Sequence, residues 1–383
     1  MGYVTHLPGV GLPGPVIAAA LAAAFLASTM LLGRAVPGPQ IAATAAVGGL
    51  ITGLINLLVL GSLLADQPQE APVLALWVTG WLALSSVVAL LAALLGARML
   101  ASLDLTAGPQ LWLSRFARLT VLSIILLLPI GGIVTSTETG MAVPDWPTSF
   151  EANMFLFPLS KMTGGIYLEH AHRLFGALVG LTTLTLTGLT LAVDRRGWVR
   201  ILAVLALILV IAQGVMGGLR VNLDSGPLRL LHGLTAQIFF AYMVAFAAFV
   251  SLRWRTAPPQ SPTIGAGVIR GLSAALVVCL FIQIAFGAAV RHFDLNMHAL
   301  ISHLSFSVVV LVLAIATGIR ASRAHAEHVM LKKPGKALIH TVGLQMLLGG
   351  AALWAVLVHR ESDPLIEILL ATAHQVVGAI LLA

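Results

Sequence analysis

Long apolar stretches recur along the chain and are separated by short polar connections. We count eleven of them, each about as long as a helix that crosses a bilayer. A spanning β-barrel would instead show short segments of alternating polarity, which this sequence lacks. The pattern therefore predicts an all-α integral membrane protein with about eleven transmembrane helices, over residues 13–33, 41–65, 73–97, 112–134, 164–192, 199–219, 228–250, 268–290, 298–319, 337–358 and 365–383.

The placement of charge orients these helices. The chain is 59% hydrophobic and 9% charged, with a formal net charge of +7. Fifteen of the 21 Lys and Arg residues lie in alternate connections: Arg34, Arg98, Arg115, Arg118, Arg195, Arg196, Arg200, Arg253, Arg255, Arg270, Arg320, Arg323, Lys332, Lys333 and Lys336. By the positive-inside rule these connections face the cytoplasm. We therefore expect a multi-pass protein of the cell inner (plasma) membrane, both termini on the outer, periplasmic side, and no nucleic-acid partner.

Composition and repetition divide the chain into three parts. The first three apolar stretches contain almost no ionisable residue, so we interpret residues 1–105 as a membrane segment for packing or docking. A linker that contains Gly-Pro follows at 101–111. From residue 112 a helical hairpin repeats four times, and its first helix ends in a glycine-rich phrase: PIGGIVT, QGVMGGLRV, QIAFGAAVR or QMLLGGAAL. The repeat predicts two pseudo-symmetric four-helix bundles, over 106–260 and 261–383.

Each hairpin carries one histidine near the start of its second helix: His172, His232, His303 and His374. A histidine in the hydrocarbon region is costly unless it faces the bundle interior and has a partner or ligand. Taken singly, His232 or His303 fits a hydrogen-bonded interior histidine equally well. Their matching depth in successive hairpins favours two bis-imidazole iron sites. We prefer His303 over His298 as the ligand because His303 lies deeper, and His298 is the reserve.

The segment 169–173 contains the densest group of reactive side chains. Glu169 and His172 are three residues apart and share one helix face. Glu169 can exchange a proton beside a bound substrate, and Arg173 can pair with a carboxylate such as a heme propionate. The alternative is an interfacial cluster that reaches to water. His170 points elsewhere on the helix, and we predict a surface histidine there.

Three arginines on the outer side, Arg220, Arg229 and Arg291, break the charge pattern. Local anionic partners such as heme propionates would explain them, and so would solvation in loops. The outer connection 135–163 contains TSTETGMAVPDWP, a composition typical of an ordered interfacial loop. It can cover a heme edge, receive a partner, or serve only as a connection. The lone cysteine, Cys279, excludes an internal disulfide and a thiolate metal cluster.

Together these motifs resemble the heme A synthase family, membrane enzymes that finish the heme of aa3-type respiratory oxidases. The resemblance covers about residues 112–383. It is carried by the loop TETGMAVPDWPTSF, the Glu-x-x-His-Arg sequence of 169–173, the phrase QGVMGGLRV, and the helix openings LLHGLTAQ and ATAHQ.

The resemblance implies an eight-helix core that oxidises the C8 methyl group of heme O to a formyl group through a hydroxymethyl stage, giving heme A. It assigns His172, His232 and Glu169 to catalysis at heme O, with Glu169 as the acid/base or oxidant-positioning carboxylate. His303 and His374 would ligate a heme b cofactor, and Arg173, Arg229 and Arg291 would bind the hemes. Candidate partners are membrane lipid, a heme O synthase, cytochrome oxidase subunit I and a second copy of the chain. The electron donor stays open.

The chain departs from the family pattern in three ways. The three leading apolar stretches are not part of the family core, the outer loops lack a cysteine pair, and Leu304 follows His303 where many members have arginine. Two other functions fit the histidines. A bis-histidine membrane cytochrome b for quinol electron transfer would give Glu169 no special task. A heme-binding assembly carrier would release its heme unchanged.

Overall fold

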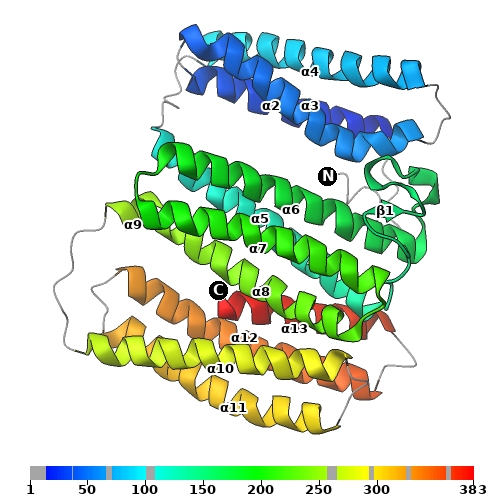
Figure 1. Ribbon diagram of the computed structural model, residues 1–383. Coiled ribbons are helices and arrows are strands. Elements are labelled where there is room, and N and C mark those ends of the chain that lie inside the picture. Colours follow the sequence, from blue (N-terminus) through cyan, green and yellow to red (C-terminus); the bar gives the residue numbers. More distant parts are fainter. Residues whose placement is uncertain are drawn as a thin grey trace. The chain divides into compact units, whose positions relative to one another are not determined.

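The computed structural model describes residues 14–36, 38–65, 71–100, 108–256, 265–292, 297–324, 329–358 and 364–383 (Figure 1). Each predicted apolar stretch coincides with a helix of at least 19 residues in this part of the chain. The long helices are α2 (Gly14–Ala35), α3 (Ile41–Ala65), α4 (Ala71–Met99), α5 (Pro109–Ser136), α6 (Gly164–Val193), α7 (Gly197–Asn222), α8 (Gly226–Phe249), α10 (Ala266–His292), α11 (Met297–Ile319), α12 (Val329–Val358) and α13 (Pro364–Leu382).

Short elements lie in the connections. They are η1 (Gly38–Gln40), strands β1 (Thr148–Ser149) and β2 (Ala152–Asn153), the turns η2 (Met154–Leu156) and η3 (Leu159–Lys161), α9 (Leu252–Arg255) and the π-helical turn η4 (Arg320–Ala324). Among the described residues, nine helices are long and apolar enough to cross a membrane. Shorter apolar stretches, Ala22–Arg34 and Ile41–Leu57, lie in α2 and α3. The all-α, multi-pass class is confirmed, whereas the count of eleven spans stays a prediction.

Two compact units make up the chain. The first comprises Met1–Trp112 and Ala142–Leu174, and the second comprises Leu113–Met141 and Phe175–Ala383. The predicted division at residues 105 and 260 falls outside the described residues, so the three-part organisation stays a prediction.

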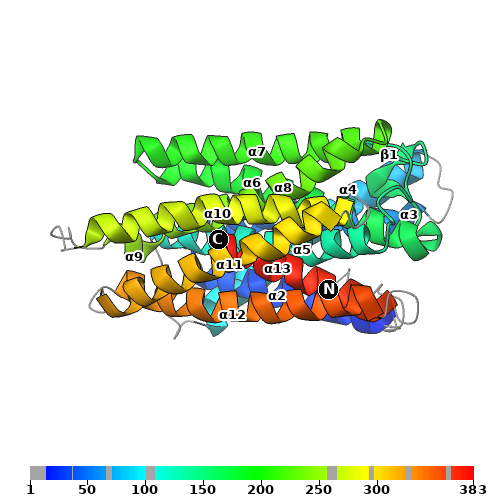
Figure 2. The same ribbon diagram turned by 90° about the horizontal axis from the view of Figure 1, so that it is seen from below.

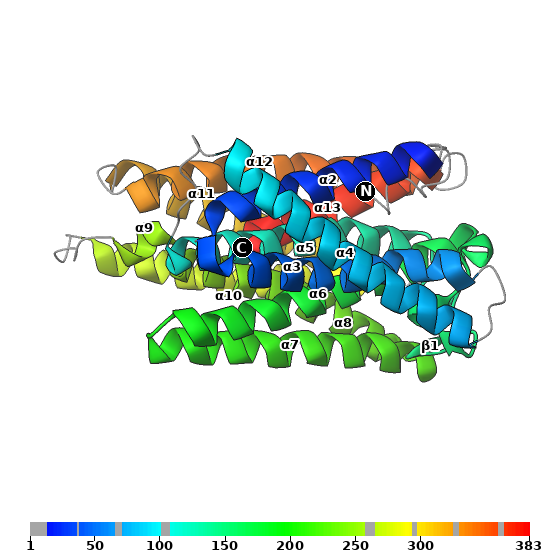
Figure 3. The same ribbon diagram turned by 90° about the horizontal axis from the view of Figure 1, so that it is seen from above.

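In the first unit, α4 packs against α2 and α3 (Figure 3), and glycines lie where the helices come closest. A Cβ atom on Gly33 of α2 would overlap the main-chain oxygen of Ala93, and one on Gly96 of α4 would overlap that of Met30. Helix α4 therefore crosses α2 at backbone contact distance. Lipid and apolar side chains have similar polarity, so close packing of this kind, rather than exclusion of water, holds membrane helices together.

The second unit contains two apolar cores. One is formed mainly by α5, α6, α7 and α8, with Leu113, Leu186 and Phe240 among its buried side chains. The other is formed by α10, α11, α12 and α13, which Figure 2 shows side by side, and includes Leu276 and Val310. These cores are the second unit's main source of packing, and they place the histidine-bearing helices next to their hairpin partners.

Hydrogen bonds between helices supplement this packing. Thr187 of α6 donates to the main-chain oxygen of Ala203 in α7 over 2.9 Å, and Tyr242 of α8 donates to that of Leu202 over 2.6 Å. In a membrane each such bond contributes about 1 kcal/mol. They fix the rotation of α6, α7 and α8 about their own axes.

A buried carboxylate joins two basic connections of the second unit. Asp194 is 2% exposed, and its oxygens accept from Arg196 at 2.8 Å and from Arg255 at 2.7 Å. Burial alone would raise the pKa of Asp194. The hydrogen bonds and positive charge of Arg196, together with the charge of Arg255, outweigh burial and hold the pKa below its ordinary value of 3.8. The carboxylate thus ties the end of α6 to α9.

We predict that Asp194→Asn lowers the free energy of unfolding of the whole chain by about 3 kcal/mol, because it leaves the partly buried guanidinium groups of Arg196 and Arg255 without a charged partner. The control is Asp224→Asn, since Asp224 is 76% exposed and lies 3.5 Å from a half-exposed Arg229. An exposed pair of this kind contributes less than about 1 kcal/mol. Denaturant titration in mixed micelles measures both variants, and equal effects would contradict the prediction.

Candidate functional site

Three hairpins of the second unit hold a histidine ring against a glycine. The ring of His232 on α8 faces Gly217 on α7, with its Cε1 atom 3.0 Å from where a Cβ on that glycine would lie. The corresponding distance is 2.9 Å in the two hairpins that follow, where His303 faces Gly287 and His374 faces Gly349. A side chain on any of these glycines would displace the ring. The glycine-rich phrases therefore make room for the histidines.

A main-chain carbonyl group adds to the contact of one of these rings. The Nδ1 atom of His303 lies 3.2 Å from the carbonyl oxygen of Gln283. When Nδ1–H donates to such a carbonyl, the Nε2 lone pair is the one that can bind a metal.

The rings of His303 and His374 face one another. Their centroids are 6.1 Å apart and their planes are 85° from parallel. Two metal–nitrogen bonds of about 2 Å, plus about 1.2 Å from each nitrogen to its ring centre, give about 6 Å. The spacing therefore fits two imidazoles on opposite sides of one iron. His298 lies in the first turn of α11 and is exposed.

Three glutamines at this level of the bundle were not among the predicted site residues. Gln213, Gln283 and Gln345 each precede their hairpin's glycine by four residues, one helical turn. Each has a buried Oε1 atom without a hydrogen-bond partner among the described residues. The signal was available, because each of the three glycine phrases begins with glutamine.

In the first unit, Glu169 is the centre of a buried polar network. The side chain is 1% exposed. Its Oε1 accepts from Arg173 at 2.7 Å and its Oε2 accepts from the main-chain N–H of Val143 at 2.7 Å. Arg173 also donates to the carbonyl oxygens of Val143, Asp145 and Thr148, over 2.8, 2.6 and 3.0 Å. The described contacts of this guanidinium thus fix the loop onto α6.

Asp145 organises the loop itself. Its carboxylate accepts from the hydroxyl of Thr148 and from the main-chain N–H groups of Phe150 and Glu151 at 2.7 and 2.8 Å. Phe150 and Glu151 have φ values of 51° and 64°, and they form the tight turn between β1 and β2. A left-handed conformation is unfavourable for residues other than glycine. The hydrogen bonds from the two main-chain N–H groups to the Asp145 carboxylate offset that cost. The peptide bond between Trp146 and Pro147 is cis.

The predicted surface position of His170 is wrong. The side chain is fully buried, its Nδ1 lies 3.2 Å from the hydroxyl of Ser149, and its ring centroid lies 5.2 Å from that of Phe157. Loop residues cover the face of α6 that the sequence pattern suggested was open. The loop is therefore held by three residues of α6: Glu169, His170 and Arg173. These contacts anchor the segment of α6 that carries His172.

The other two predicted heme-binding arginines have different surroundings. Arg291 at the end of α10 donates to the main-chain oxygen of Gly132 at 3.0 Å and to the hydroxyl of Ser136, both on α5. It therefore connects the two four-helix groups of the second unit. Arg229 lies near the start of α8, half-exposed and paired loosely with Asp224. Neither arrangement tests the prediction that they bind heme.

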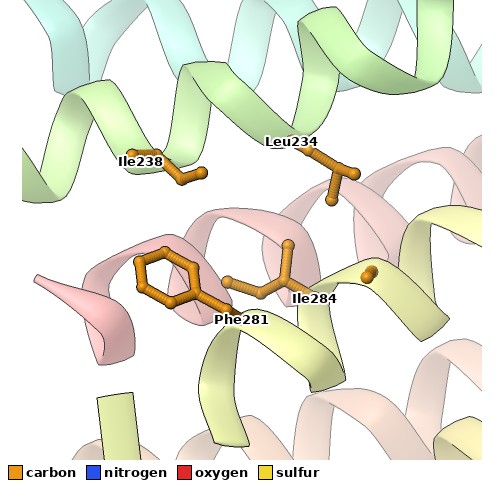
Figure 4. A pocket seen from close by; sticks show the side chains of 5 residues that line it. Leu234, Ile238, Phe281 and Ile284 are labelled. Atoms are coloured by element: carbon orange, nitrogen blue, oxygen red, sulfur yellow. The ribbon is translucent and has the colours of Figure 1, made fainter. Parts of the chain in front are cut away.

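An apolar cavity lies between α8 and α10 (Figure 4). Its volume is 180 Å³, and its walls are Leu234 and Ile238 of α8 and Phe281, Ile284 and Ala285 of α10. These side chains offer no group for acid–base chemistry. The cavity suits an apolar chain.

Comparison with known proteins places these residues in context. Residues 114–300 match the sequence profile of the COX15-CtaA family, described as cytochrome oxidase assembly protein. The matched region contains Glu169, His172 and His232, and it ends just before His303.

The chain is also similar to a heme A synthase from Lysinibacillus sphaericus (strain C3-41). The two are 28% identical over 186 residues, which is 48% of this chain. The chain covers 59% of that relative's length. Residues 114–300 are therefore similar to the COX15-CtaA family of cytochrome oxidase assembly proteins.

Proposed function

We propose that this chain is a heme A synthase, a membrane oxidoreductase that oxidises the C8 methyl group of heme O to a formyl group through a hydroxymethyl intermediate. The observation that carries this proposal is the family match, which spans the segment containing Glu169, His172 and His232. The product would supply aa3-type cytochrome oxidases. The electron donor and the source of the formyl oxygen are left open.

In the proposed substrate site, His172 and His232 are the ligands of the heme O iron. The resemblance to heme A synthases supports His172. The contact of the His232 ring with Gly217 adds support for His232, because this contact fixes one ring orientation in an apolar bundle.

Glu169 is the residue we propose for proton transfer beside the substrate. Its Oε1 and Oε2 atoms each accept one hydrogen bond, from Arg173 and from the N–H of Val143. A carboxylate oxygen has more than one lone pair, so each can still accept a proton from a substrate hydroxyl group. The loop over 142–157 is hydrogen-bonded to Glu169 and Arg173. It would exclude water from the proton transfer.

In the second half we propose His303 and His374 as the axial ligands of a heme b cofactor, which would supply electron transfer when bound. The 6.1 Å spacing between the two ring centroids supports this assignment. Arg173, Arg229 and Arg291 are proposed to interact with heme propionates. Arg291, in the second unit, also donates hydrogen bonds to Gly132 and Ser136 of α5.

We further propose that the chain lies in the cell inner membrane with both termini outside, as the basic connections indicate. A heme O synthase and cytochrome oxidase subunit I are the proposed partners for substrate delivery and product transfer. The helices α2, α3 and α4 are candidates for docking such a partner or a second copy of the chain.

Glu169→Gln should reduce the yield of heme A and of its hydroxymethyl precursor on the order of 100-fold, the usual contribution of a general acid–base group. The measurement is mass analysis of extracted hemes from cells that supply heme O. Glu151→Gln is the control, because it neutralises an exposed carboxylate in the same loop. A parent protein that yields only unchanged heme would point to the cytochrome or carrier functions instead.

Replacing the proposed cofactor ligands should remove one heme. We expect His303→Ala and His374→Ala each to lose the low-spin, bis-histidine absorption of heme b, and His298→Ala to retain it. Optical spectra and heme quantification of the purified variants distinguish these outcomes. Loss of the spectrum in His298→Ala, with retention in His303→Ala, would assign the ligand to His298.

The loop should respond to pH through Asp145. Burial raises the pKa of Asp145, but the hydrogen bonds from Thr148, Glu151 and Phe150 outweigh burial and hold the pKa below 3.8. A lowered folded-state pKa means that stabilisation is present above the unfolded pKa and lost as pH falls through the folded pKa. Hydrogen-exchange protection of the Phe150 and Glu151 amides should therefore persist at about pH 5 and be lost only well below about pH 4, as the pH falls through the folded-state pKa.

In Asp145→Asn these two amides should exchange quickly at both pH values, since the neutral side chain offers one acceptor oxygen in place of two. Protection that is the same in parent and variant would show that the carboxylate does not hold the turn.

A further inference from the structure

Two connections at one end of the second unit meet around Asp194. The first joins α6 to α7, and the second continues from α8 through α9. Asp194 accepts from Arg196 of the first connection at 2.8 Å and from Arg255 of the second at 2.7 Å. Arg196 also donates to the main-chain oxygen of Phe249, at the end of α8, over 2.9 Å. The two connections therefore form one continuous surface.

This surface carries much more positive than negative charge. Residues 194–200 and 251–256 contain one carboxylate, that of Asp194, and five guanidinium groups that we call the arginine cluster: Arg195, Arg196, Arg200, Arg253 and Arg255. Among the described residues, Asp194 is the only carboxylate that forms an ion pair with the cluster. Its side chain is fully buried, whereas about a quarter of the Arg196 and Arg255 side chains is exposed. The other three arginines are exposed. The excess of positive charge therefore faces outward.

Two tryptophans border the arginine cluster. Trp198 and Trp254 are 46% and 42% exposed, and their rings pack edge-on against Phe249, with centroids 5.3 and 5.1 Å from its own. The Arg196 guanidinium lies 5.2 Å from the centroid of the Trp198 ring. The neighbouring apolar spans begin at Gly197 and end at Phe249. Tryptophan is enriched where the hydrocarbon of a bilayer meets its headgroups, so the arginine cluster lies at the level of the lipid phosphates.

The first turn of α7 adds to the positive field at this surface. Its N-cap residue is Arg196, which makes no side-chain capping bond. The first N–H groups of a helix have no partner within the helix, and they carry a partial positive charge. The turn and the guanidinium groups thus favour the same kind of ligand, an anion.

We propose that the arginine cluster binds the headgroup of an anionic phospholipid such as phosphatidylglycerol. Arg195, Arg200 and Arg253 pair with the phosphate, because a guanidinium group matches phosphate oxygens with two parallel hydrogen bonds. Trp198 and Trp254 lie against the first part of the acyl chains. Free phosphate shares the charge of this ligand but has no chains for the tryptophans. The proposal is independent of any heme chemistry and requires only the membrane-spanning fold.

The test is native mass spectrometry of the full chain, released from nanodiscs that contain equal amounts of phosphatidylglycerol and phosphatidylcholine. We expect the parent to retain phosphatidylglycerol in preference to phosphatidylcholine. Each basic side chain near an anionic membrane surface favours that surface by about fivefold. A triple variant should therefore lose at least about tenfold of the preference: Arg195→Gln, Arg200→Gln and Arg253→Gln. These three arginines lie outside the ion pairs of Asp194, so the two connections stay joined.

The matched control removes the same charge from another basic connection, by Lys332→Gln, Lys333→Gln and Lys336→Gln. These lysines are exposed at the start of α12, and the control should keep the parent's preference. If the arginine variant does not fold, the single variants Arg195→Gln and Arg253→Gln decide. Each should lower the preference by a few fold.

A parent without lipid preference would overturn the proposal, as would an equal loss of preference in the arginine and lysine variants, which would show a general effect of net charge. Inorganic phosphate added before release gives a further arm. Displacement of phosphatidylglycerol by phosphate alone would show a site for any small anion, and retention of the lipid supports the headgroup site.

Discussion

A polar side chain inside an apolar helix bundle can find partners only within the protein or in a ligand, since lipid offers none. The buried polar groups of this chain follow that constraint in three ways. Asp194 is neutralised by Arg196 and Arg255, Glu169 by Arg173 and a main-chain amide, and the imidazoles of His232, His303 and His374 lie against glycines of the preceding helix. The first two sets are complete within the described chain. The Nδ1 atom of His374 has no hydrogen-bond partner among the described residues.

Repetition gives the second unit its regular geometry, and small changes within the repeat distinguish its halves. The ring-to-glycine distances of His232, His303 and His374 agree within 0.1 Å in the nearest contact. The polar contacts differ between hairpins. The amide of Gln283 lies 3.1 Å from Nδ1 of His303, that of Gln345 lies 3.4 Å from Nε2 of His374, and that of Gln213 donates to the hydroxyl of Thr235. A common backbone frame can in this way carry different polar contacts in successive hairpins.

The loop between α5 and α6 shows how a short segment can bring several functions together. Within five residues of α6, Glu169, His170 and Arg173 all bind loop atoms, and Asp145 in turn holds the loop's tight turn. The consequence is that the carboxylate proposed for chemistry also stabilises structure. Substitutions at Glu169 therefore need readouts of loop order as well as of product.

The sequence by itself determined the helices and the candidate ligands. Runs of apolar residues long enough to cross a bilayer define elements by length alone, and the phasing of histidines with glycine phrases marks His172, His232, His303 and His374 as a set. Only the tertiary structure decided which side chains meet. His170 is buried because Ser149 and Phe157, more than ten residues earlier, fold back over it, and helical periodicity carries no information about such a loop. The same reason applies to Gln283 and Gln345. The sequence shows that an amide precedes a glycine, but only the tertiary structure shows that the imidazole of the next helix lies beside that amide.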